Sequence, residues 1–206
     1  MIDRDKRPPI LPTATHKSRI FYGWWIIFGA FAGSALSASF NFHGISAFFL
    51  PIANAFNVSR TAVATAISLA RIEGALIGPL EGYLVDRFGP RRMMFIGVPI
   101  MAVGFLVMGN APNFGVFVGA FILGVVLGSS LGFGIPLSTS VANWWHRKRG
   151  RAFGIMWLGF SLASISVYGI VWLIDTYDWR VAFQIMGVLV LVVGFPIAAI
   201  MRHRPE

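Results

Sequence analysis

GYLVDRFGPRR, Gly82 to Arg92, stands between two apolar runs that are each long enough to cross a bilayer. Gly82 and Gly89 allow backbones to approach closely, and Pro90 interrupts a continuous helix. An aspartate such as Asp86 can cap a helix end. We therefore expect a short, tightly turned loop between two membrane helices, with four charged residues in it: Asp86, Arg87, Arg91 and Arg92.

The composition of the chain excludes an ordinary soluble domain. Hydrophobic residues make up 56% of its 206 residues and charged residues only 12%, whereas soluble domains carry about 25% charged residues. The mean hydropathy is +0.72. Because the chain has no cysteine, a disulfide framework and thiolate chemistry are also excluded.

Six apolar segments follow one another along the chain, and each approaches or exceeds the length of a spanning helix, about 20 residues. They lie at residues 21–50, 61–85, 93–110, 114–143, 152–174 and 180–201. Turn-forming and charged residues separate them at 51–59, 86–92, 110–113, 144–151 and 175–179. The segments lack the alternation of barrel strands, so we expect an all-α membrane protein with six transmembrane helices.

The basic residues predict the orientation of these helices. Fourteen of the 17 Lys and Arg residues fall on one side of the six-helix arrangement, and the positive-inside rule places that side in the cytoplasm. We expect an integral protein of the cell (inner) membrane with both termini cytoplasmic. The expected domains are a cytoplasmic tail at 1–19, a six-helix transmembrane half-domain at 20–202, and the start of a central loop, or a truncated end, at 203–206. The loops account for the net charge of +9, so nucleic acid is not an expected partner.

An internal repeat relates the end of the second apolar segment to the end of the fifth. LVDRFGPR at Leu84 to Arg91 aligns with LIDTYDWR at Leu173 to Arg180. The first closes helix 2 and the second closes helix 5, so three crossings separate them and the two copies run in opposite directions. This predicts the inverted 3+3 repeat found within one half of many carriers.

The same motifs resemble those of a known family. GYLVDRFGPRR resembles the signature loop of the major facilitator superfamily. WHRKRGRAFG, Trp145 to Gly154, and DWRVAF, Asp178 to Phe183, resemble its helix 4/5 loop and the start of its helix 6. YGWW, at residues 22–25, is similar to the branch that carries monocarboxylates and exchanges oxalate for formate. The resemblance covers the amino-terminal six helices of a fold with twelve.

This resemblance implies alternating access, in which one six-helix half moves against another around a central site. It also implies a conformational latch on the cytoplasmic face, formed by the residues that match the signature loop: Gly82, Asp86, Arg87, Gly89, Arg91 and Arg92. The alternative is that these arginines only fix the topology. Helix 4 has Gly124 where drug exporters of the family carry an arginine, and helix 5 has Tyr168 where the family often places a proline, which argues against that branch.

Charged residues inside a span are costly, by about 2.5 to 3.5 kcal/mol on insertion scales, and Arg71 and Glu73 lie near the middle of helix 2. Their spacing of two places them on different faces of a helix. A guanidinium matches the two oxygens of a carboxylate, so Arg71 is our candidate counter-ion for an anionic substrate, and Glu73 is a second substrate or coupling candidate. The alternative is an interhelical salt bridge.

Helix 1 supplies two further candidates, His43 and Asn41. His43 is a histidine inside an expected span, and its imidazole can titrate in the physiological range, which suits a proton-coupled step. The alternative is an imidazole bonded to a neighbouring hydroxyl. Near the end of helix 2, Glu81 is expected to support the charge network of the latch loop.

Helix 4 carries two stretches of glycines at four-residue spacing, a pattern that lets helices pack backbone to backbone: Gly115 and Gly119, then Gly124, Gly128 and Gly132. Of these we expect Gly124, Gly128 and Gly132 to form a packing face. Hydroxyls on the same helix are candidates for lining a cavity: Ser129, Ser130, Ser138 and Thr139.

Two other functions fit parts of the sequence. GSSLG, at residues 128–132, fits the GxSxG motif of serine nucleophiles, with Ser130 at the serine position. Rhomboid-type intramembrane proteases also have six helices. Such a protease needs a histidine base, and helix 6 has none because His203 lies beyond it. The second alternative is a complete six-helix protein that works as a homodimer.

The favoured reading is the amino-terminal half of a secondary active transporter for a small solute, an organic anion such as a monocarboxylate. It is not an enzyme, and no catalytic residue, metal or cofactor is expected. The chain has no GxxxxGK[ST] loop, so a gradient rather than ATP supplies the energy. The expected partners are the solute, a coupling proton, the lipid bilayer and a carboxy-terminal six-helix half.

Overall fold

The computed structural model describes residues 22–201 of the chain. Within them, six long helices have the length and hydropathy to cross a membrane, which confirms the expected fold class. The expected tail at 1–19 and the segment at 203–206 lie outside the described residues. We number the six helices 1 to 6 in chain order.

Helices 1 and 4 are continuous but irregular. Helix 1 consists of α1 (Gly23–Ser37), the π-helical η1 (Ala38–His43) and α2 (Gly44–Ala55). Helix 4 consists of α5 (Phe114–Ala120), η2 (Phe121–Val126), α6 (Leu127–Ser129), η3 (Ser130–Gly134) and α7 (Ile135–Trp144), where η2 and η3 are again π-helical. Single π-helical turns inside α-helices are frequent at functional sites.

The other four helices follow the expected segments closely. Helix 2 is α3 (Arg60–Phe88), and the side chain of Ser59 caps it by accepting from the Ala62 amide. Helix 3 is α4 (Pro90–Gly109), and helix 6 is α10 (Trp179–Ile200). Helix 5 consists of α8 (Arg149–Leu162), a 3₁₀ turn η4 (Ala163–Ile165) and α9 (Ser166–Tyr177).

Two expected loops are shorter in the structure. Helix 1 is expected to end before Pro51, but α2 continues through this proline to Ala55. Membrane helices tolerate the loss of the backbone hydrogen bond that a proline causes. Between α3 and α4 only Gly89 lies outside a helix. Asp86 therefore caps no helix end: it is an exposed residue of α3, and Pro90 starts α4 at the position where proline is favoured.

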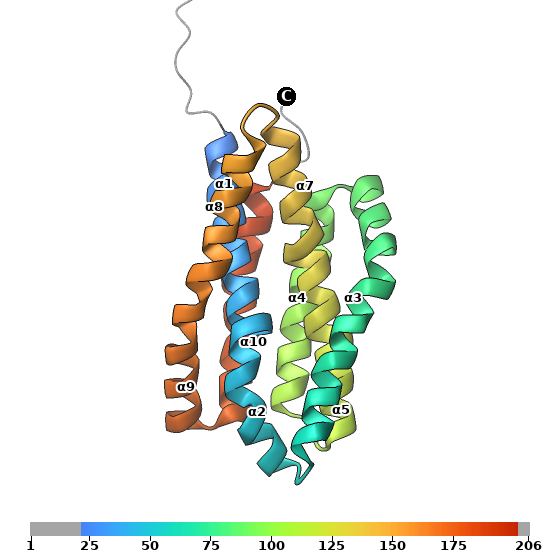
Figure 1. The fold of residues 1–206 in the computed structure, drawn as a ribbon, viewed down its shortest axis with the longest axis vertical. Helices are drawn as coiled ribbons and strands as arrows, with labels where there is room; N and C mark the ends of the chain where they lie inside the picture. Colours follow the sequence, from blue (N-terminus) through green and yellow to red (C-terminus); the bar gives the residue numbers. More distant parts are fainter. Residues whose placement is uncertain (1–21, 202–206) are drawn as a thin grey trace, which may run out of the picture.

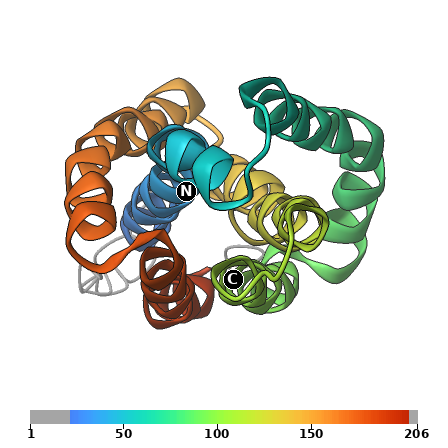
Figure 2. The same cartoon turned by 90° about the horizontal axis from the view of Figure 1, so that it is seen from below.

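The helices are arranged as two interlocked sets of three. Helices 3 and 6 pack against each other, α1 packs on α8, and helix 4 packs on α3. These contacts are preserved when helices 1, 2 and 3 are exchanged for 4, 5 and 6, as the inverted 3+3 repeat requires. Figure 2 shows α3 and α8–α9 at opposite edges of the bundle, with helices 1 and 4 between them.

The basic turns gather at one end of the bundle. The α3–α4 junction and the α7–α8 connection both lie at the upper end in Figure 1, where Arg87, Arg91, Arg147 and Lys148 are exposed. This is the charge asymmetry from which the orientation in the membrane is predicted. Large apolar side chains are exposed along the outer helices, as a lipid environment allows: Ile72, Leu76, Leu80, Leu158 and Trp172.

The core joins helices 1, 3 and 6 through stacked aromatic rings. Phe48, Phe105 and Phe183 are each almost fully buried. The rings of Phe48 and Phe183 are stacked with their centroids 4.1 Å apart, and Phe105 lies 6.1 Å from Phe183. Such pairs add about 0.5 to 1.5 kcal/mol each to the gain from burial. The rigid core leaves α3 and helix 5 as the less buried elements at the two edges.

Candidate functional site

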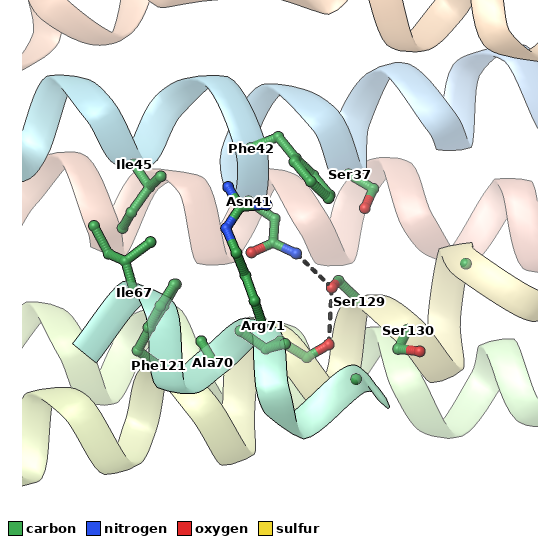
Figure 3. A pocket seen from close by; sticks show the side chains of 13 residues that line it. Ser37, Asn41, Phe42, Ile45, Ile67, Ala70, Arg71, Phe121, Ser129 and Ser130 are labelled. Carbon is green, nitrogen blue, oxygen red and sulfur yellow. Dashed lines mark hydrogen bonds between the residues drawn. The ribbon is translucent and has the colours of Figure 1, made fainter. Parts of the chain in front are cut away.

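A cavity of about 370 Å³ lies between helices 1, 2 and 4. Its wall is mostly apolar, with polar groups in the middle, which is the usual construction of a small-molecule site. Figure 3 shows the side chains that converge on it from η1, α3 and helix 4. The residues on which the argument depends are Ser37, Asn41, Phe42, Arg71, Ser129 and Ser130.

Arg71 brings a positive charge into this cavity. Its side chain reaches from α3 toward helix 1, as Figure 3 shows, and its guanidinium carbon lies 5.7 Å from the centre of the Phe42 ring. Among the side chains that the structure describes, no carboxylate forms an ion pair with Arg71. The guanidinium therefore keeps its donors available on the cavity side.

Glu73, the other charged candidate, lies on α3 two residues further along. Its side chain lies outside the described part of the structure. Its role as a substrate or coupling residue stays a prediction.

Asn41 occupies the wall opposite Arg71. It lies on η1, and its Nδ2 donates to Ser129 Oγ over 2.9 Å. Ser129 Oγ in turn donates to the Val126 carbonyl over 2.9 Å. This chain fixes the amide of Asn41 in the cavity, and it is drawn in Figure 3. Asn41 thus lies within the π-helical turn η1, and Ser129 lies in α6 between the π-helical turns η2 and η3.

His43 is not among the residues that line this cavity. Its half-buried ring meets Phe160 of helix 5 edge to face, with ring centroids 5.6 Å apart. Its buried Nε2 atom has no hydrogen-bond partner among residues 22–201. The structure thus separates His43 from Asn41 and Arg71, and it shows no hydroxyl bonded to Nε2.

A second cavity, of about 580 Å³, lies between helices 1, 4 and 5. It shares Ser37, Phe42 and Gly134 with the first, so the two adjoin along helix 1. Ser138 and Thr139, which the sequence offered as hydroxyls, line this second space together with the aromatic rings of Trp157 and Phe160.

Glu81 does not join the charge network of the latch loop, contrary to expectation. Its side chain is only 1% exposed, and its Oε2 accepts a hydrogen bond from Ser130 Oγ of helix 4. The other oxygen, Oε1, is buried and has no partner in the described part of the chain. The expectation failed because the helix turns Glu81 inward, toward helix 4, while the charged residues that follow it stay on the surface.

The contact between Ser130 and Glu81 also bears on the protease alternative. A serine nucleophile needs a histidine within hydrogen-bond reach. In the part of the chain that the structure describes, Ser130 donates to a carboxylate and no histidine bonds to it. Ser130 has the surroundings of a structural hydroxyl beside a cavity.

The charged residues of the latch loop are all exposed: Asp86, Arg87, Arg91 and Arg92. Arg87 donates to the Tyr83 hydroxyl over 3.1 Å, and Arg91 lies 5.9 Å from the Phe95 ring centre. No ion pair joins them within residues 22–201. No atom of this chain lies near the open side of Gly82, so the backbone approach expected there is absent within the described residues. The latch stays a prediction.

The glycines of helix 4 meet α4 backbone to backbone. A Cβ built on Gly124 lies 2.4 Å from Gly104 Cα, and one built on Gly128 lies 2.4 Å from the Met101 nitrogen. Gly132 faces Gly97 in the same way, with 3.2 Å to the nearest backbone atom. Gly119, at the other end of the glycine series, faces open space.

Sequence reasoning missed three features of the site. It did not identify Phe42 as the ring beneath Arg71, although Phe42 stands between the two polar candidates of helix 1. It did not predict the aromatic wall of Trp157 and Phe160. It also missed the contact between Glu81 and Ser130, for which no local signal exists.

The chain matches a family and several known proteins. The family model of the Major Facilitator Superfamily matches residues 27–206. An uncharacterized MFS-type transporter of Bacillus subtilis, YcxA, is 26% identical over 188 residues, which are 89% of this chain and 45% of that protein. Monocarboxylate transporter 3 of Gallus gallus is 31% identical over 175 residues, or 82% of this chain and 31% of that protein.

Two further comparisons bear on branch and fold. The oxalate:formate antiporter of Oxalobacter formigenes is 28% identical over 153 residues, 71% of this chain and 36% of that protein. A solved structure of a bacterial homolog of the human lysosomal transporter Spinster, in an inward-facing and unoccupied conformation, has a TM-score of 0.71 at 20% identity. It covers 91% of this chain and 44% of that protein, and it shows the fold alone.

The chain spans less than half the length of each of these relatives. The matched region includes helices 1 to 6 almost completely, with the signature loop between helices 2 and 3 inside it. Because the family model covers residues 27–206 and the six-helix fold agrees with that of a solved transporter, the chain belongs to the major facilitator superfamily.

Proposed function

We propose that this chain forms one half of a secondary active carrier that moves a small organic anion across the membrane by alternating access. The observation that carries the proposal is the guanidinium of Arg71, which enters the cavity between helices 1, 2 and 4 without a carboxylate partner among the described residues. An unpaired cation inside a membrane span is expensive. A bound anion would supply the missing countercharge.

The size and polarity of the cavity fit a small anion. Arg71 offers a fork of donors that matches two carboxylate oxygens, and Asn41 and Ser129 stand at the facing wall. The relatives named as monocarboxylate transporters and as an oxalate:formate antiporter support the same substrate class. We therefore infer a monocarboxylate or a short dicarboxylate as the solute.

We also infer that a second six-helix unit closes the cavity. The relatives are about twice as long as this chain or longer. On α3, Gly74, Gly78 and Gly82 form a small-residue face, and no other element of residues 22–201 comes within 4 Å of a side chain placed there. Such a face suits close packing of another helix. A carboxy-terminal half and a second copy of this chain are the two ways to supply it.

Transport by the full-length protein in proteoliposomes tests the proposal. Labelled lactate, formate and oxalate are offered to the wild type, Arg71→Ala, Arg71→Lys and the control Arg60→Ala, which removes an exposed arginine at the start of the same helix. We expect Arg71→Ala to lower uptake about tenfold or more and Arg71→Lys to retain part of it, because lysine keeps the charge without the fork. Wild-type uptake of all three anions by Arg71→Ala would refute the proposal.

A further inference from the structure

Glu81 is the only acidic side chain that is buried among those the structure describes. It lies in α3 inside the second span, one oxygen accepts from Ser130 Oγ, and the other is buried without a partner. The transport mechanism proposed above does not use it. A buried carboxyl with an unsatisfied oxygen therefore needs a separate explanation.

Within residues 22–201, no positively charged side chain pairs with this carboxyl. Of the elements packed against α3, only α4 carries titratable residues, Arg91 and Arg92, and both are exposed; α2, η2, η3 and α7 carry none within their bounds. Among the other titratable residues of α3 itself, the side chains that the structure describes are all exposed and do not bond to Glu81: Arg60, Arg71, Tyr83, Asp86 and Arg87. Val85, one helical turn after Glu81, and Leu131, the residue after Ser130, belong to a small apolar cluster with Met93.

The free-energy cost of burial decides whether the neutral carboxyl or the carboxylate is favoured at this position. An isolated carboxylate in an apolar environment loses far more hydration energy than a neutral carboxyl does. One hydrogen bond from Ser130 does not replace that hydration. The contact of α3 with η3 is therefore compatible with the neutral acid, and it disfavours the anion.

Ser130 connects Glu81 with the anion cavity. The same serine that donates to Glu81 lines the cavity around Arg71. Its neighbour Ser129 bonds to Asn41 on the opposite wall. A change at Glu81 that displaces Ser130 therefore changes the wall of the cavity directly.

We propose that Glu81 is a proton-binding residue of this carrier, and that it couples a proton to the anion site through Ser130. As α3 closes on η3, Oε1 takes up a proton from a hydronium ion of the adjoining aqueous phase, which leaves water, and the carboxyl becomes neutral; when α3 separates from η3, water hydrates the group and accepts the proton as hydronium. Nothing is oxidised or reduced. The proton-binding part stands on the geometry of Glu81 alone, and only the coupling part rests on the proposed function.

Proteoliposomes with the full-length protein test the coupling. The variant Glu81→Gln mimics the neutral acid permanently, and Asp175→Asn is its control because Asp175 is an exposed carboxylate at the end of α9. We expect Glu81→Gln to lower pH-gradient-driven uptake of labelled lactate about tenfold or more while anion exchange without a gradient stays within about twofold. Asp175→Asn keeps both. Full gradient-driven uptake by Glu81→Gln would overturn the coupling.

A second measurement does not depend on transport. Infrared difference spectra of the purified full-length protein, recorded during a pH titration, are expected to show the C=O band of a protonated carboxyl that is absent in Glu81→Gln and present in Asp175→Asn. Ser130→Ala should shift this band, since it removes the hydrogen bond to Oε2. Identical bands in the wild type and Glu81→Gln would overturn proton binding.

These two readouts separate the proposals from each other. If Arg71→Ala transports normally, the anion site is wrong, and the titrating band still decides whether Glu81 binds a proton. If Glu81→Gln does not fold, the variant Ser130→Ala provides the test. A shifted C=O band together with reduced pH-gradient-driven uptake supports proton binding by Glu81, and an unchanged C=O band overturns it.

Discussion

Gly89 and Asp178 adopt the same backbone conformation at equivalent positions of the internal repeat. Gly89 has φ 83° and ψ 151°, and Asp178 has φ 93° and ψ 150°. Each follows a helix and donates its amide to the carbonyl four residues earlier, Gly89 to Val85 and Asp178 to Ile174. Each is also the single residue between two helices. The repeat seen in the sequence therefore extends to the geometry of the two turns.

Gly89→Ala is predicted to destabilise the protein. The backbone region at φ 83° and ψ 151° is nearly reserved for glycine, and placing another residue there costs about 1 to 3 kcal/mol. Thermal unfolding of the purified protein in detergent measures the effect. Gly119→Ala is the control, because Gly119 lies in α5 with open space around its missing side chain. Equal melting temperatures for the two variants would contradict the prediction.

The two substitutions Asp178→Gly and Asp178→Ala are predicted to differ. Asp178 tolerates its positive φ because Oδ1 accepts from the Trp179 amide over 2.8 Å. Glycine removes this bond and also the strain, whereas alanine removes the bond and keeps the strain. We expect Asp178→Ala to be less stable than Asp178→Gly, by about 1 kcal/mol or more. The same unfolding measurement checks the order, and a reversed order would show that the strain at residue 178 is negligible.

Gly128→Ala is predicted to separate helix 4 from helix 3. The added Cβ would lie 2.4 Å from the Met101 nitrogen and 2.7 Å from its Cα, and backbone atoms cannot move aside as a side chain can. Overpacking of this kind costs about 1 to 3 kcal/mol. Gly154→Ala, on α8 with nothing within 4 Å, serves as the control. If both variants melt at the wild-type temperature, the close contact of helices 3 and 4 is not needed for stability.

The sequence predicted the six spans because hydropathy and segment length are local properties that lipid enforces. It placed a break at Pro51 wrongly, since a proline in a membrane helix does not necessarily end it. The environment of Glu81 could not be predicted, because its partner Ser130 is 49 residues away and sits at a π-helical turn that sets the rotation of helix 4. The position of Arg71 at a cavity could be predicted, because a charge in the middle of a span is itself informative, and its role toward a substrate stays a prediction.

Asn41→Asp is predicted to weaken anion binding through its charge. Asn41 and Arg71 line the same cavity, so a carboxylate at position 41 would compete with the substrate for the guanidinium and repel the anion. We expect the half-saturating concentration of labelled lactate to rise about tenfold or more in anion exchange by the full-length protein. Asn110→Asp is the control, since Asn110 is exposed at the end of α4, outside both cavities.

Asn41→Leu distinguishes the charge from the lost hydrogen bond. Both variants remove the Nδ2 group that donates a hydrogen bond to Ser129 Oγ, but only aspartate adds a negative charge. If the charge is what matters, Asn41→Leu raises the half-saturating concentration less than Asn41→Asp does, and the double variant Asn41→Asp with Arg71→Ala adds little to Arg71→Ala alone. An equal loss in the two single variants would instead assign the effect to the bond between helices 1 and 4, and Asn41 would then support the cavity wall without facing the anion.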